Sequence, residues 1–129
     1  MDKDLEIVEL TQKNIESMVY VIRNQKVMLY FDLARIYGYE TKRFNEQVKN
    51  NIEKFPEDFM FQITKVESEQ LSRSKKSTAM PIMQTIGIKG GRTSYPYAFT
   101  EQGIYMLMTV LKGELAIKQS LTLIRLFKQ

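Results

Sequence analysis

The chain has 129 residues, 43% of them hydrophobic and 26% charged, which suits one compact domain with its own core. It contains no Cys and no His, which excludes disulfides, thiol nucleophiles, imidazole bases and Cys/His zinc sites. No apolar run approaches membrane-spanning length, and the acidic start at residues 1–4 is unlike a secretory signal. We therefore expect a cytoplasmic domain that is not an enzyme and needs no cofactor.

The net charge of +4 is unevenly distributed along the chain. Residues 1–16 form an acidic segment with five carboxylates and two Lys side chains. The stretch from Gln70 to Thr100 contains no Asp or Glu, and its five cations are Arg73, Lys75, Lys76, Lys89 and Arg92. A concentrated basic segment attracts polyanions such as DNA or RNA, although such a run is often only a solvated surface.

The chain begins with a predicted short helix and a β-hairpin. Thr11 can cap a helix that ends near Glu16. Apolar, β-branched segments at 19–22 and 26–29 then flank a three-residue turn, which is typical of a hairpin.

A pair of short helices is predicted next. Asp32 is a suitable N-cap for a helix at 33–37, and Gly38 can end that helix in a left-handed conformation. Thr41 can cap a second helix from Lys42 to about Lys54. Two helices joined by so short a turn have the outline of a helix-turn-helix.

The second of these helices is amphipathic. Its apolar stripe, expected to be buried, consists of Phe44, Val48, Ile52 and Phe55. Its opposite face carries Lys42, Arg43, Glu46, Lys49, Asn50 and Glu53. Asn51 lies close to the apolar stripe, so we expect it to anchor the following turn.

The middle of the chain predicts a strand, a helix and a long loop. Alternation at 59–63 predicts a strand with Phe59, Phe61 and Ile63 facing inward. Thr64 and Glu67 form a capping box that opens a helix to about Leu71. Residues 72–94 have little periodicity and three Gly, so they are expected to form a basic loop.

Two apolar helices are predicted at the C-terminal end. Residues 95–99 are extended, Thr100 caps a helix at 102–112, and Gly113 separates it from a last helix at 114–129. Apolar positions of the first helix are Ile104, Leu107, Met108 and Leu111, and those of the last are Leu115, Leu121, Ile124, Leu126 and Phe127. Because the last helix has no terminator, we expect residues 1–129 to be one domain of a protein that continues into a C-terminal domain.

Two sequence motifs resemble those of a known family. The first comprises Lys26–Leu29, Asp32–Gly38, Thr41–Lys42, Val48–Lys49, Asn51 and Phe55–Phe61. The second is Tyr95–Gly103, running into the apolar helix at 104–111. Together they resemble the KilA-N-like N-terminal domain of phage and prophage proteins, the family named after open reading frame six of a temperate phage. The resemblance implies a small α+β DNA-binding domain, usually joined to a variable C-terminal domain in antirepressor-like regulatory proteins.

These motifs suggest which residues would contact double-stranded DNA. If the helix from Thr41 enters a major groove, Lys42, Arg43 and Lys49 would hold phosphates, and amides of Asn45, Gln47 or Asn50 would read base edges. The cations Arg73, Lys75, Lys76, Lys89 and Arg92 would form a basic arm that neutralises phosphates. For both sets the alternative is an ordinary solvated surface.

The sequence gives little support for a catalytic function. Residues 87–92 lack the Gly-Lys-Ser/Thr ending of a phosphate-binding loop. Glu57, Asp58 and Glu101 are the carboxylates that a metal-dependent nuclease would use, but turn and helix-start positions explain all three. We therefore expect no catalytic residues and no metal site.

We predict an α+β fold with an N-terminal β-hairpin, a helix-turn-helix-like pair, a short strand, a basic loop and two C-terminal helices. The predicted function is DNA binding in a phage-related regulator. The alternative is a protein-interaction module that binds a repressor or forms a homodimer through the apolar C-terminal helix. The apolar stripe of that helix could equally pack within one monomer.

Overall fold

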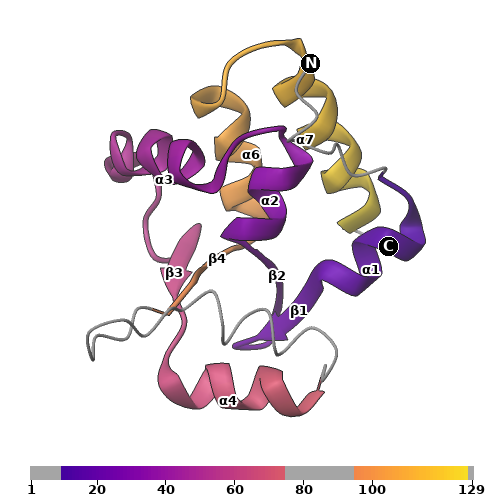
Figure 1. Cartoon of the computed structure of the whole chain (residues 1–129), viewed down its shortest axis with the longest axis vertical. Coiled ribbons are helices and arrows are strands. Elements are labelled where there is room, and N and C mark those ends of the chain that lie inside the picture. The colour runs from indigo at the N-terminus through magenta and orange to yellow at the C-terminus, as the bar shows by residue number, and fades with distance from the viewer. Residues whose placement is uncertain (1–9, 75–94, 128–129) are drawn as a thin grey trace.

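The computed structural model describes residues 10–74 and 95–127, and it shows the α+β fold that the sequence predicts (Figure 1). Among these residues no helix is long and apolar enough to cross a bilayer. The elements in chain order are α1 (Gln12–Met18), β1 (Val19–Ile22), β2 (Gln25–Leu29), α2 (Tyr30–Ile36), α3 (Thr41–Lys49), a 3-10 turn (Ile52–Lys54), β3 (Met60–Gln62), α4 (Lys65–Ser74), β4 (Tyr97–Phe99), α6 (Glu101–Val110) and α7 (Glu114–Phe127).

The four strands form an antiparallel sheet in the order β1-β2-β4-β3. Met28 and Met60 both pair with Phe99 and face the helices α1, α2, α3, α6 and α7. Their neighbours Leu29 and Phe61 pair with Ala98 and face α4 on the other side (Figure 1). The strand expected at 59–63 is shorter, because β3 covers only Met60–Gln62. Phe61 and Ile63 are buried as expected, but Phe59 is only partly buried, and Met60 is also buried because helices cover both faces of the sheet.

The hairpin turn connects the sheet to α4. Arg23 and Asn24 have φ values of 57° and 62°, so the turn takes two residues and Gln25 already belongs to β2. The Arg23 guanidinium lies 3.9 Å from the ring centre of Phe61 and donates to Glu67 at 2.7 Å. Glu67 in turn accepts from the backbone of Thr64, which confirms the predicted capping box.

Two predicted caps are wrong. α2 begins at Tyr30 directly after β2, so Asp32 lies buried in the first turn of the helix instead of preceding it. α3 begins at Thr41 after Glu40, which has extended backbone and makes no side-chain capping bond. α2 continues directly from β2, and α3 begins soon after the left-handed Gly38, so both predicted caps lie inside their helices.

The end of α3 also differs from the prediction. The helix stops at Lys49 rather than Lys54, because the Asn51 side chain donates to the carbonyl of Gln47 at 2.8 Å and the chain tightens into the 3-10 turn. Asn51 thus anchors the turn as expected. Ile52, predicted to be buried, is 52% exposed.

The C-terminal helices pack against each other and against α1 and α2. Thr100 caps α6 as predicted, and Gly113 separates α6 from α7 with a φ of 111°. On α7 the predicted apolar stripe is only partly buried, because Leu115 and Leu121 are exposed while Ile124 and Phe127 are buried. Two polar residues occupy the stripe instead: Ser120 hydrogen-bonds Tyr37, and Gln119 donates to the carbonyl of Ile36.

Candidate nucleic-acid interface

The turn between α2 and α3 has a geometry that ends one helix and starts the next within a few residues. Gly38 has a φ of 72°, a left-handed conformation that suits glycine. Its backbone N–H donates to the backbone carbonyl of Arg35, and the N–H of Tyr39 donates to the backbone carbonyl of Ala34. These are the paired bonds of a Schellman motif. The prediction for Gly38 is confirmed, and α3 therefore follows α2 closely.

Aromatic packing fixes α3 against the sheet. The Phe44 side chain is fully buried, and its ring meets the rings of Phe99 and Tyr39 edge to face, at centroid distances of 5.8 and 6.5 Å. Phe55 meets Phe99 in the same way from beyond the 3-10 turn. These contacts hold one side of α3 in the core, so the other side faces solvent.

The exposed half of α3 carries most of the side chains predicted to contact DNA. Helical periodicity of about 100° per residue separates two flanks. One flank holds Lys42, Asn45 and Lys49, and the other holds Arg43 and Asn50; all five are exposed. Gln47 is only partly exposed, and Glu46 lies between the two flanks.

The cations of α3 are available for a ligand. Within residues 10–74 and 95–127, no side chain forms an ion pair or hydrogen bond with Lys42, Arg43 or Lys49. The Arg23 guanidinium, by contrast, is engaged by Glu67, and this hydrogen bond raises the pKa of Arg23 and lowers that of Glu67. Arg23 therefore has a structural partner, whereas the three cations of α3 have none among the described residues.

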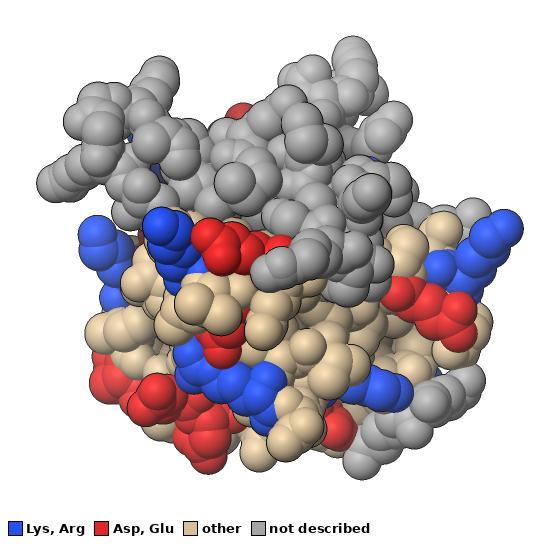
Figure 2. All heavy atoms as spheres, turned by 90° about the horizontal axis from the view of Figure 1, so that it is seen from below, with Lys and Arg blue, Asp and Glu red and all other residues tan. Residues whose placement is uncertain are grey.

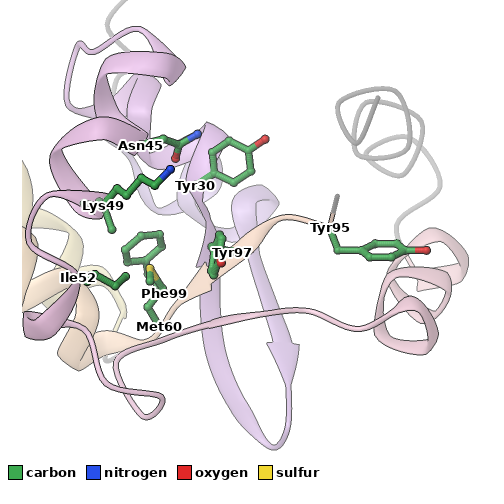
Figure 3. Close-up of a pocket in the computed structure, with 9 residues that line it drawn as sticks. Tyr30, Asn45, Lys49, Ile52, Met60, Tyr95, Tyr97 and Phe99 are labelled. Atoms are coloured by element: carbon green, nitrogen blue, oxygen red, sulfur yellow. The ribbon is translucent and has the colours of Figure 1, made fainter. Parts of the chain in front are cut away.

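A hollow of about 320 Å³ lies beside α3, between this helix and the sheet (Figure 3). Asn45 and Lys49 extend from α3 toward the rings of Tyr30 and Tyr97, and Phe99 lies below them (Figure 3). Burial raises the pKa of Tyr30 above its ordinary value. The hollow is lined by Tyr30, Asn45, Val48, Lys49, Ile52, Met60, Tyr95, Tyr97 and Phe99.

Sequence patterns did not reveal this hollow. Tyr30 begins α2, Tyr97 lies on β4, and Asn45 and Lys49 lie on α3, so only the fold brings them together. The pairing of β2 with β4 supplies the reason: Met28 pairs with Phe99 and Leu29 with Ala98, so the end of β2, which Tyr30 follows, lies beside β4.

The predicted basic arm cannot be placed in the same way. Lys75, Lys76, Lys89 and Arg92 lie outside the described residues, and so does the side chain of Arg73, whose backbone belongs to α4. Seen from below Figure 1, the described surface shows Lys and Arg side chains interspersed with Asp and Glu (Figure 2).

The three carboxylates considered for catalysis are spread over the structure. Glu57 is highly exposed, 3.9 Å from Arg23, and Asp58 is exposed in the same turn. Glu101 begins α6. Among the described residues, no three Asp or Glu side chains are grouped so that they could hold a metal ion.

A model of the ORF6N domain matches residues 17–110, most of the chain. The chain belongs to the ORF6N domain family. This phage-associated, KilA-N-like family is the one indicated by the two sequence motifs. Neither the curated proteins nor the solved structures contain a match. In this ORF6N domain the matched residues include the hairpin, α3, the hollow and α6, while α7 follows them.

Proposed function

We propose that this ORF6N domain binds double-stranded DNA through the exposed half of α3, within an antirepressor-like regulatory protein of phage origin. One observation carries the proposal: a helix held in place by Phe44 turns three uncommitted cations and two amides toward solvent. An α-helix fits the width of the major groove, where phosphates lie on both sides and base edges at the centre.

The arrangement on α3 gives its side chains different tasks. Lys42, Arg43 and Lys49 would contact phosphates, which set the position of the domain on the duplex. Asn45 and Asn50 carry both donors and acceptors, so they would read base edges. Glu46 lies between the flanks and would repel phosphates. The basic segment between Gln70 and Thr100 would add electrostatic attraction.

The proposal is tested by fluorescence anisotropy with a labelled duplex over a range of salt concentrations. Lys42→Ala combined with Arg43→Ala should weaken binding and reduce the slope of log K against log salt by about two. Glu46→Gln should strengthen binding, because it removes the central negative charge.

The matched control removes two exposed cations from α7, on the other side of the molecule from α3 (Figure 1). Lys118→Ala combined with Arg125→Ala changes the net charge by the same amount and should leave affinity nearly unchanged. An equal loss in both double variants would mean that net charge, and not α3, determines binding.

A second candidate function is protein interaction through α7, as a homodimer or with a repressor. It is favoured by three exposed apolar side chains, because Leu115, Ile117 and Leu121 are 40%, 48% and 37% exposed. Association through such a surface would depend little on salt, unlike phosphate contacts. Analytical ultracentrifugation at low and high salt separates the two: a monomer at both would exclude a homodimer through α7 at the concentration used.

A further inference from the structure

The hollow beside α3 differs in its lining from a gap in a core. Its floor consists of buried Val48, Met60 and Phe99. Its rim carries the side chains of Tyr30 and Tyr97, which come from two different elements. The Asn45 amide and the Lys49 ammonium group complete the rim. A packing defect needs only apolar walls, whereas small-ligand sites combine apolar walls with a few converging polar groups. Its volume of about 320 Å³ lies at the lower end of such sites.

Tyr97 is unusually accessible for its place in the fold. It lies on β4, an inner strand of the sheet, and pairs with Gln62 of β3. Nevertheless the residue is 41% exposed. Its ring and that of Tyr30 are turned toward the space beside α3, while the ring of Tyr95 lies apart, near α4 (Figure 3). The sheet therefore presents aromatic surface next to the helix proposed to contact DNA.

The polar groups at the rim match the parts of a nucleotide. Aromatic side chains stack on the flat face of any base. The Asn45 amide offers a donor and an acceptor to a base edge, and within the described residues it has no other partner. Lys49 lies one helical turn further along α3 and supplies a cation for the attached phosphate.

We propose that the hollow accepts one unpaired nucleobase of a DNA strand while α3 contacts the adjoining backbone. This inference rests on the proposed function. It adds that the preferred DNA carries an extrahelical or otherwise unpaired base, which stacks against Tyr30 and Tyr97 and hydrogen-bonds Asn45. A paired base cannot enter, because its edge and both faces are already occupied in the duplex.

The test compares three labelled duplexes of the same sequence with the whole 129-residue chain. One is fully paired, one carries a single bulged thymidine, and one carries a bulged abasic site, which keeps the extra sugar and phosphate but lacks the base. We expect the bulged thymidine to bind about tenfold more tightly than the abasic bulge, the effect of one stacked base.

Tyr97→Ala should remove this preference, and so should Tyr97→Leu, which keeps an apolar side chain but cannot stack. The matched control is Tyr105→Ala on α6, because Tyr105 is similarly exposed at 47% and does not line the hollow. It should retain the tenfold preference. Circular dichroism confirms that each variant is folded.

The outcomes distinguish this inference from the proposed function. Equal, salt-sensitive affinity for all three duplexes would overturn the hollow as a base site and leave DNA binding by α3 intact. Absence of binding to any duplex would overturn both. Displacement of the bulged duplex by free thymidine monophosphate at comparable concentration would also overturn the inference, because the site would then serve a free nucleotide.

Discussion

Replacing Gly103 with Ala should destabilise the domain, because backbone lies directly against this residue. A Cβ at Gly103 would stand 2.1 Å from the carbonyl oxygen of Phe59, well inside the 3.4–4 Å of an ordinary contact. The obstructing atom belongs to the main chain, so no side-chain rotation can relieve the clash. Either α6 or the turn that contains Phe59 would have to move.

Such a movement would disturb the hydrogen bonds that connect the two segments. The Thr100 N–H donates to Phe59 at 3.0 Å, and the Thr100 hydroxyl donates to the carbonyl of Asp58 at 2.8 Å. Overpacking costs about 1–3 kcal/mol, and weakened hydrogen bonds add about 1 kcal/mol each. The better helix propensity of Ala offsets about 1 kcal/mol. The net loss is about 2–4 kcal/mol, which lowers Tm by on the order of 10 °C.

Urea unfolding followed by circular dichroism measures this loss. Gln102→Ala is the matched control, because Gln102 is exposed in the same turn of α6 and its replacement should change the free energy of unfolding by less than about 0.5 kcal/mol. A Gly103→Ala variant as stable as the wild type, or more stable, would refute the close approach of α6 to Phe59. It would also remove the steric reason for glycine at the end of the motif at 95–103.

Two further predictions concern pH. The hydrogen bond from Arg23 lowers the pKa of Glu67 below its ordinary value of 4.5, so this pair stabilises the fold above that pH and the contribution is lost as pH falls through the lowered pKa. Glu67→Gln should cost at most about 1 kcal/mol at neutral pH, and urea titrations at neutral pH and near pH 3 should show a smaller acid-induced loss than in the wild type. Burial raises the pKa of Tyr37 from 10 to about 12, so the folded state favours the protonated hydroxyl; this contribution to stability is fully present below pH 10 and is lost as pH rises toward 12. Tyr37→Phe should cost about 1 kcal/mol at neutral pH and reduce the alkaline loss in thermal melts; an unchanged alkaline profile would contradict the assignment.

Local interactions explain why much of the fold could be predicted. Thr11, Thr64 and Thr100 each accept from a backbone N–H three residues ahead, so the sequence around each cap contains both partners. Gly38 and Gly113 take backbone conformations that depend on the residue itself. The two motifs likewise indicated the family, because the order and spacing of their residues along the chain are properties of the sequence alone.

The exact helix ends and the hollow beside α3 depend on tertiary contacts. α2 starts directly after β2 and α3 starts after Glu40, so neither Asp32 nor Thr41 serves as the cap that its type suggests. The end of α3 depends on the Asn51 side chain. The hollow is the clearest case, because Tyr30 follows β2 and Tyr97 lies on β4, and only the pairing of these two strands brings both residues to the same hollow. Periodicity predicts which face of a helix or strand is apolar. It does not predict which other element packs against that face, or how much of the face that element buries.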